Sequence, residues 1–338
     1  MNNWSLLQHT SRTFYLSIRS LPAEIGKALC LAYLMLRVSD YLEDTQALST
    51  AEKVRLLNLW QRVIRGESPA AEFERRIRDL PSYDEKDYQA AIRAGSILQQ
   101  LRELPGDLGN TISDHVRQST RGMARWVLRG PQIETETDMD DYMHEVAGRV
   151  GYLSTEVFAY HSAPVRARMN RLMPLAREAG LALQTVNIIR GLRKDYERGW
   201  IYVPEAFCRQ AGITRDQLFD PQYRKQAMAV LSRLVAKAER HLQAALSYVL
   251  LLPRTIYRIR RACIWPMLLA IRTVAISDAN PQVLSGGVKI PRHEVKQIVR
   301  CSTLFGWSDH WLTLYSRRLR RPLRGGHPDT EHPVLLSG

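Results

Sequence analysis

Apolar residues recur along this chain with a period close to 3.6 residues, which places them on one face of an α-helix. No persuasive run alternates apolar and polar residues in the manner of a β-strand, and no long low-complexity linker divides the chain. The segments with the helical period are separated by turn signals and cover residues 3–20, 23–43, 50–65, 83–103, 108–128, 138–160, 165–178, 180–197, 221–250, 254–278 and 291–318. The pattern therefore predicts an all-α fold.

Length and composition favour a single domain. The chain has 338 residues, of which 45% are apolar, so it can bury a substantial core. We expect this domain to cover residues 1–318. The basic tail at residues 319–338 is rich in Gly, Pro and charged residues, and we expect it to be disordered.

The formal net charge is +14, which is compatible with a nucleic acid, an anionic membrane surface or an anionic substrate as the partner. Much of the excess lies in two short clusters, residues 254–261 and 317–324, outside any recognisable DNA- or RNA-binding motif. We therefore expect no nucleic-acid partner. For the second cluster, a solubilising role and a contact with a membrane surface remain as alternatives.

Cysteine spacing and the apolar runs bear on the cellular compartment. The four cysteines are far apart without a CxxC pair, which indicates neither a zinc site nor a disulfide framework: Cys30, Cys208, Cys263 and Cys301. The first residues show no secretory signal, and no window reaches the roughly 18 uncharged apolar residues that span a bilayer. We expect a cytoplasmic protein, with peripheral attachment to a membrane left open.

Three carboxylates end an apolar run that otherwise predicts a buried helix. Asp40, Glu43 and Asp44 follow the apolar residues 28–38 and, at spacings of three and four, share one helix face. Their mutual repulsion costs free energy unless a cation or a solvent-filled cleft accepts them. Hard oxygen ligands of this kind suit Mg²⁺. The alternative is a solvated acidic helix end without a ligand.

A second polar helix face lies in residues 180–204. Its residues follow one another at spacings of three and four: Gln184, Asn187, Gly191 and Asp195. Arg190 and Arg198 flank this line. A carboxamide and a carboxylate can ligate a second hard cation, and arginines can hold phosphate oxygens in a bidentate manner. An ordinary amphipathic helix with exposed charges is the alternative.

Two such helices facing each other across a bundle would enclose a cation-rich pocket for a diphosphate, with apolar walls for a hydrocarbon tail. Loss of diphosphate from an allylic carbon leaves a carbocation. An enzyme for this chemistry must therefore hold the leaving group with Mg²⁺ and basic residues and exclude water. The two polar faces predict the metal end of such a site, and the apolar helices predict its dry end.

Four motifs in a fixed order carry a resemblance to a known family. SRTFYLSIRSLP, AYLMLRVSDYLEDT, YMHEVAGRVG and ALQTVNIIR followed by RGWIYVP lie within residues 5–310. With these motifs the chain resembles the squalene/phytoene synthase family, the trans-isoprenyl diphosphate synthases that join two prenyl diphosphates head to head. The resemblance implies an isoprenoid synthase helical bundle with a central cavity, and a prenyl diphosphate as substrate.

The resemblance also implies roles for individual residues. Mg²⁺ ligands would be Asp40, Glu43, Asp44, Asn187 and Asp195. The catalytic set would be Tyr142, close to the cyclopropyl-forming chemistry, with Asp40, Asp44, Asp195 and Arg190. Substrate contacts would come from Ser11, Arg12, Thr13, Phe14, Tyr33, Arg37, Val146, Gly148, Gln184, Asn187 and Arg198. For Tyr142 and Gly148, close packing in a helical bundle is the simpler alternative.

The second motif departs from the family pattern. Family members usually carry an aspartate where this chain has Gly191, and a glutamate where it has Lys194. Only Asp195 remains as a carboxylate, so a weaker second metal cluster is expected, with Lys194 able to hold phosphate as a point charge.

Residues 263–293 resemble squalene synthases more than phytoene synthases. This implies reduction with NADPH near Cys263, Lys289 and Arg292, although Ala262 stands where an aromatic residue is usual. The resulting hypothesis is a monomeric squalene synthase that condenses two farnesyl diphosphates and uses Mg²⁺ and NADPH. The alternatives are a phytoene or dehydrosqualene synthase without a reductant, and a non-catalytic prenyl-lipid binding protein with a degraded second motif.

Overall fold

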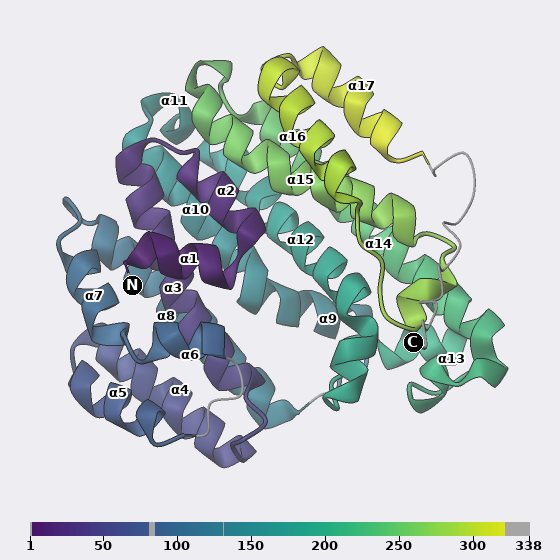
Figure 1. Cartoon of the computed structure of the whole chain (residues 1–338), viewed down its shortest axis with the longest axis horizontal. Helices are drawn as coiled ribbons and strands as arrows, with labels where there is room; N and C mark the ends of the chain where they lie inside the picture. The colour runs from purple at the N-terminus through teal and green to yellow at the C-terminus, as the bar shows by residue number, and fades with distance from the viewer. Residues whose placement is uncertain (1, 81–84, 131, 322–338) are drawn as a thin grey trace, which may run out of the picture.

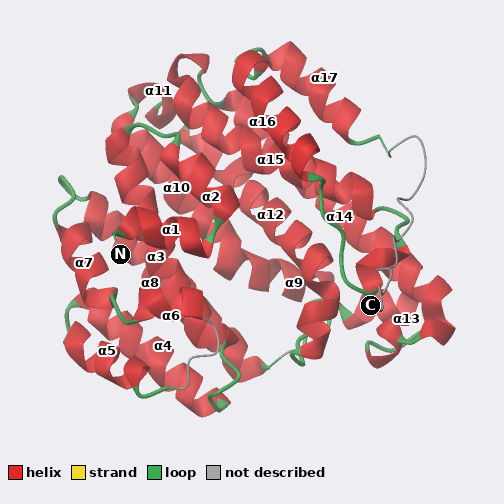
Figure 2. Cartoon of the chain, viewed as in Figure 1, coloured by secondary structure: helices red, strands yellow, loops and turns green. Residues whose placement is uncertain are grey.

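Every regular element that the structure describes is a helix, as the apolar period predicts (Figure 2). The structure is a computed structural model that describes residues 2–80, 85–130 and 132–321, without the side chains of Arg12, Thr13, Glu85 and Lys86. The N-terminal helices lie on one side of the molecule in Figure 1 and the C-terminal ones on the other, with α12 between them. The predicted tail therefore lies outside the described residues, apart from residues 319–321.

The N-terminal half contributes one long buried helix and several shorter ones. They are α1 (Asn3–Thr10), α2 (Arg12–Arg19), α3 (Ala23–Asp44), α4 (Thr50–Arg65), α5 (Ala70–Arg78), α6 (Glu85–Ala91) and α7 (Ala94–Arg102). Local signals set their ends: Ser49 and Glu52 form a capping box before α4, and Gly66 ends this helix with φ at 79°. Ser11 separates α1 from α2 and caps α2, so the predicted helix at residues 3–20 is two helices.

The middle of the chain forms three long continuous helical stretches. The elements are α8 (Leu108–Arg129), α9 (Glu136–Met143), the π-helical turn η1 (His144–Gly148), α10 (Arg149–His161), α11 (Ala163–Arg166) and α12 (Met169–Glu197). The sequence pattern predicts two helices where α12 runs without a break. Gly180 suggests an end, but a Cβ there would lie 2.3 Å from the Ala147 carbonyl oxygen. This glycine therefore permits close helix packing.

The C-terminal part contains two long helices, α14 and α15, and a terminal pair of shorter ones, α16 and α17. Its elements are α13 (Glu205–Gln210), η2 (Asp216–Phe219), η3 (Pro221–Tyr223), α14 (Arg224–Leu251), η4 (Arg254–Ile256), α15 (Tyr257–Ser277), η5 (Pro281–Leu284), α16 (Arg292–Phe305) and α17 (Asp309–Leu319). Helices α3, α8, α10, α12, α14 and α15 supply most of the buried apolar side chains. No described helix combines the length and apolar character that a membrane span requires.

The basic cluster at residues 254–261 is used inside the fold. Arg258 donates to the carbonyls of Ser20 and Leu21 at 3.0 and 2.7 Å, which ties α15 to the end of α2. Arg260 is fully buried and donates to the Leu252 carbonyl at 3.0 Å. These two arginines of the cluster satisfy backbone carbonyls and stabilise helix packing.

Candidate active site

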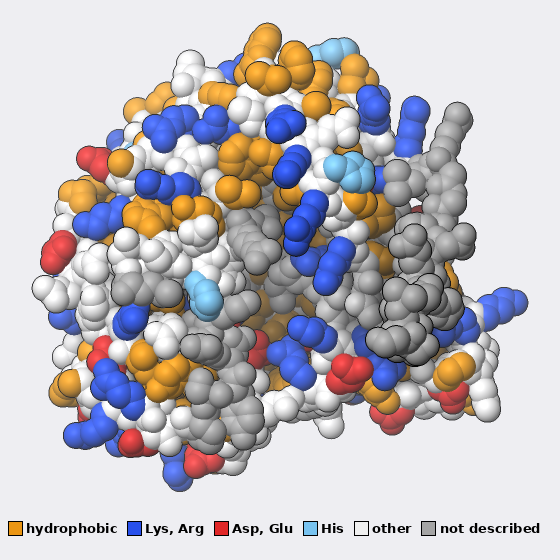
Figure 3. Space-filling model, in the orientation of Figure 1, with side chains coloured by type: hydrophobic (Ala, Val, Ile, Leu, Met, Phe, Trp, Pro, Cys, Tyr) orange, Lys and Arg blue, Asp and Glu red, His pale blue; other side chains and the backbone are white. Residues whose placement is uncertain are grey.

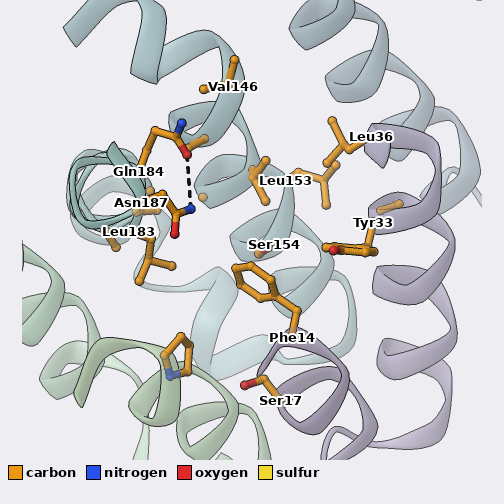
Figure 4. Close-up of a pocket in the computed structure, with 18 of the residues that line it drawn as sticks. Phe14, Ser17, Tyr33, Leu36, Val146, Leu153, Ser154, Leu183, Gln184 and Asn187 are labelled. Atoms are coloured by element: carbon orange, nitrogen blue, oxygen red, sulfur yellow. Dashed lines mark hydrogen bonds between the residues drawn. The ribbon is translucent and has the colours of Figure 1, made fainter. Parts of the chain in front are cut away.

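One cavity of about 490 Å³ lies between α2, α3, α9, η1, α10, α12, α14 and α15. One end is polar and carries the two motifs, and the rest is apolar. Figure 4 shows Tyr33 and Leu36 of α3 on one side, Leu183, Gln184 and Asn187 of α12 on the other, and Phe14 of α2 between them. The cavity is lined by carboxylates of the first face and by residues of the second, which confirms the prediction that the two polar helix faces share one cavity: Asp40, Glu43, Asp44, Gln184, Asn187 and Asp195.

The first polar face stands at the C-terminal end of α3. Arg37 donates through Nη1 to Asp40 at 2.7 Å and through Nε to Asp87 of α6 at 2.8 Å. Withdrawal from water raises the pKa of Asp40 to about 6, and the nearby carboxylates Asp44 and Asp87 add to this rise against Arg37. The site therefore holds Asp40 in an environment with too little positive charge for its ionised form.

Glu43 is the most buried of the three carboxylates. Its side-chain atom Oε1 is buried without a hydrogen-bond partner among the described residues. Burial raises the pKa of Glu43 well above its usual value, and the charges of Asp44 and Asp40 raise it further. Lys53 of α4 comes from outside the motif and donates to the Glu43 carbonyl at 2.7 Å. Lys53 is a contact that the sequence motif does not reveal.

The second polar face meets the first through one arginine. Arg198, at the end of α12, lies with Nη2 2.5 Å from Asp195 and with Nη1 3.5 Å from Asp44 of α3. Asn187 is exposed toward the cavity and donates to Gln184 at 3.5 Å, the contact drawn in Figure 4. Because one cation contacts a carboxylate from each motif, the two faces form a single electrostatic unit.

Gly191 lines the cavity between Asn187 and Asp195. A Cβ at this position would lie 2.8 Å from Oδ2 of Asp195. The missing side chain therefore lets the Asp195 carboxylate fold back over the helix, where it reaches Arg198. Burial raises the pKa of Asp195, and its hydrogen bond with Arg198 opposes this rise.

Stacked aromatic rings close the polar end. The rings of Tyr142 and Tyr202 have centroids 4.8 Å apart, and their hydroxyls are 3.2 Å apart. Trp126 meets Tyr142 edge-on, and Trp200 stacks on Tyr202. Burial raises the pKa of both phenols well above the usual value. Tyr202 follows the second motif, but only the fold shows that it contacts Tyr142.

The far end of the cavity is apolar. Phe14 and Tyr33 lie with ring centroids 5.8 Å apart, and Val146 lines the wall from the π-helical turn. Tyr248 of α14 is buried there, with its hydroxyl 2.8 Å from that of Thr155. Cys263 also lines this end, and burial raises the pKa of its thiol to about 12. The thiol is therefore neutral at physiological pH.

Several predicted residues lie elsewhere. Arg190, Lys289 and Arg292 are exposed and do not line the cavity. Ser11 caps α2 by accepting from the Phe14 backbone amide at 3.2 Å. Gly148 packs against helix neighbours, because a Cβ there would lie 2.7 Å from His144 and 3.1 Å from Leu181. The predicted contacts of the Arg12 and Thr13 side chains fall outside the described residues.

The polar end fits a hard divalent cation in its chemistry. Carboxylates from α3 and α12 and the Asn187 carboxamide offer oxygen ligands, and Oε1 of Glu43 is buried without a hydrogen-bond partner in the described part of the chain. Among the described residues, no three acidic, His or Cys side chains converge closely enough to form a ready metal cluster. The available donors are thus divided between two helices with Arg198 between them.

The fold and this site define the class of protein: an all-α bundle whose paired polar helix faces close one end of an apolar cavity. The family model for squalene/phytoene synthase matches residues 7–294, and the chain belongs to this family.

Individual relatives agree with this assignment. The squalene synthase of Schizosaccharomyces pombe is 29% identical over 301 residues, which cover 88% of this chain and 63% of that protein. Human squalene synthase is 28% identical over 303 residues, which cover 89% and 69%. The chain therefore spans about two thirds of the length of these relatives. A solved ligand complex of TcSQS superposes with a TM-score of 0.81 at 23% identity, covering 94% of this chain and 90% of that one.

Proposed function

We propose that this protein condenses two farnesyl diphosphates head to head to presqualene diphosphate and reduces this intermediate to squalene with NADPH. The observation that carries the proposal is the single cavity with carboxylates from both motifs at one end and apolar walls beyond them. A diphosphate with a long hydrocarbon chain matches both parts of this cavity.

The polar end would bind the leaving group. The residues that would hold Mg²⁺ are Asp40, Asp44, Asn187 and Asp195, and bound Mg²⁺ would neutralise the diphosphate as it departs. Arg198 already lies between the two acidic faces, so it can turn toward a phosphate oxygen without leaving the site. Arg37 holds Asp40 in place through its second contact with Asp87.

The aromatic side chains at the polar end would hold the proton that is transferred and would stabilise the carbocation. The Tyr142 hydroxyl is paired with that of Tyr202, so a proton at this oxygen can be held or passed along a fixed pair. Its ring, with the neighbouring aromatic rings, presents π-faces that stabilise positive charge. The buried apolar walls exclude water, which would otherwise capture the carbocation.

The reductive step is the finer part of the proposal. Cys263 lines the apolar end, and the loop that carries Lys289 comes within contact distance of α12, since a Cβ at Gly287 would lie 2.8 Å from the Arg190 carbonyl oxygen. Lys289, Arg292 and Arg190 offer exposed cations for phosphate groups of NADPH on this side.

Product analysis tests the proposal directly. Purified protein is incubated with farnesyl diphosphate and Mg²⁺, with and without NADPH, and the hydrocarbons are identified by mass spectrometry. Squalene that forms only with NADPH supports the proposal. A product that ignores the reductant, or a C40 product from geranylgeranyl diphosphate, would assign the protein to the dehydrosqualene or phytoene branch.

The alternative of a dehydrosqualene or phytoene synthase without a reductant has one observation in its favour. Lys289 and Arg292, which are predicted to bind NADPH, do not line the cavity. The binding-only alternative is favoured by Gly191 and Lys194. Its signature would be a wild-type protein that binds prenyl diphosphates and turns none of them over.

A further inference from the structure

Four large apolar side chains stand exposed where α16 ends and α17 begins. Leu304 is 65% exposed, Phe305 49%, Trp307 55% and, two turns further along, Leu314 50%. We name these four residues the apolar corner. Figure 3 shows apolar side chains gathered at the top of the molecule, over this end of the two helices. Single exposed apolar residues are common on protein surfaces, but four on one helix pair are a candidate contact surface.

Positive charge continues from the apolar corner along both helices. Leu304 completes a line of residues four apart on α16, so this outer face has three cations followed by an apolar end: Arg292, Lys296, Arg300 and Leu304. The end of α17 adds Arg317 and Arg318, and Arg321 follows this helix. All six cations are exposed, and none has a salt bridge within the described part of the chain.

The acidic residues of this helix pair face inward. Glu294 lies 2.5 Å from the buried Arg272 of α15, and Asp309 pairs with Arg254 and with the buried Arg260. These ion pairs fix α16 and α17 on α15. Within residues 292–321, the charges that remain on the outer surface are therefore positive. A surface with this one-sided charge does not complement a second copy of itself.

We propose that the apolar corner and the cations behind it dock this protein on an anionic lipid bilayer. Trp and Phe side chains partition to the interface between headgroups and acyl chains, and Leu side chains add buried apolar area. Lysines and arginines next to such an anchor are attracted by anionic headgroups. Insertion of the apolar side chains and attraction of the cations together give stable membrane binding, whereas either one alone gives only weak binding.

Vesicle sedimentation tests the docking without any prenyl substrate, so its result is independent of the proposed activity. The full chain is mixed with phosphatidylcholine vesicles, either pure or with about a third of phosphatidylglycerol. We expect binding to the anionic vesicles, and weaker binding as salt is raised. Lys296→Glu with Arg300→Glu should weaken the affinity roughly 30-fold or more, and Phe305→Ser with Trp307→Ser should weaken it roughly tenfold or more.

Matched variants separate this surface from general charge and apolarity. Arg55→Glu with Arg62→Glu on α4 makes the same change in net charge on exposed residues, and Leu128→Ser removes a leucine that is 64% exposed on α8. Both should bind vesicles like the wild type. Equal losses of vesicle affinity in these control variants and in the variants of α16 and the apolar corner would overturn the proposal. So would absence of vesicle binding together with a dimer that Trp307→Ser dissociates, which would make the corner a contact between copies.

Discussion

The two polar faces of the cavity differ in how they are built. The α3 face has three carboxylates and excess negative charge: the pKa of Asp40 rises to about 6, and a buried oxygen of Glu43 has no hydrogen-bond partner among the residues that the structure describes. The α12 face has a single carboxylate, Asp195, and the cation Arg198 covers it. The carboxylates of the α3 face thus have too little positive charge nearby, whereas Arg198 already balances Asp195 in the α12 face.

This difference suggests how a motif with a missing aspartate can still contribute. Gly191 opens the space into which Asp195 folds, and Arg198 then contacts both Asp195 and Asp44. In the proposed function, the α12 face would thereby contribute positive charge for a diphosphate, while the α3 face would contribute the acidic ligands. We therefore expect substitutions on the two faces to differ in the property that they change as well as in the size of the change.

The largest expected effect belongs to the α3 face. Asp40→Asn keeps the shape of the side chain and removes its charge, so turnover of farnesyl diphosphate should fall about 10³-fold or more, because a metal ligand is lost. Asp114→Asn, an exposed carboxylate on α8, is the control and should leave turnover unchanged. Steady-state rates at saturating Mg²⁺ measure both. A loss below about tenfold would remove Asp40 from the metal site.

The next effect concerns the aromatic pair between the faces. Tyr142→Phe should lower turnover about 10²-fold, because the hydroxyl that holds the proton is lost while the ring remains. Tyr202→Phe should cost less, since it removes only the partner hydroxyl at 3.2 Å. Rates of presqualene diphosphate formation measure the two effects. A larger loss of rate for Tyr202→Phe than for Tyr142→Phe would mean that Tyr202 holds the proton and Tyr142 is its partner.

A smaller effect is expected at the α12 face. Gly191→Asp adds a carboxylate beside Asp195 and should lower the Mg²⁺ concentration for half-maximal activity several-fold, roughly threefold to tenfold. Gly191→Ala adds only the Cβ that crowds Asp195, without a new carboxylate, and should change the Mg²⁺ dependence less than Gly191→Asp does. If alanine produces the same change as aspartate, release of Asp195 from the helix is the cause, and the added charge is irrelevant.

The smallest effect is on stability and depends on pH. The pKa of Asp40 rises from 3.8 to about 6 on folding, so the folded state binds more protons than the unfolded state between these values. Stability therefore falls as pH rises through this window. In EDTA, Asp40→Asn should raise Tm by a few degrees at pH 7, corresponding to about 1 to 3 kcal/mol, and much less near pH 4. Calorimetry at both pH values measures this. A variant less stable than the wild type at pH 7 would contradict the raised pKa.

The helices and the two polar faces could be predicted from the sequence because both depend on the spacing of residues along the chain. Residues three and four apart share a helix face wherever the helix lies, so Asp40 with Asp44 and Asn187 with Asp195 can be grouped without coordinates. The break predicted near Gly180 is wrong because glycine has two uses, as a helix end and as a point of close packing.

Contacts between distant segments could not be predicted in the same way. The approach of Tyr202 to Tyr142, of Lys53 to Glu43 and of Arg198 to Asp44 depends on helix packing. The exposure of Arg190 has the same origin, because a difference of one residue turns a helix side chain by about 100°. The family motif places this arginine in the site, whereas its position on α12 turns it away from the cavity.

The central claim is that both helix faces act on one bound diphosphate. A double-mutant cycle tests it: Mg²⁺-dependent binding of the unreactive analogue farnesyl thiodiphosphate is measured calorimetrically for the wild type, Asp40→Asn, Asp195→Asn and the double variant. If the faces form one site, the double variant should bind little worse than the weaker single variant, with a coupling of about 1 kcal/mol or more. Losses that simply add would show that the two faces act independently, and would contradict the account.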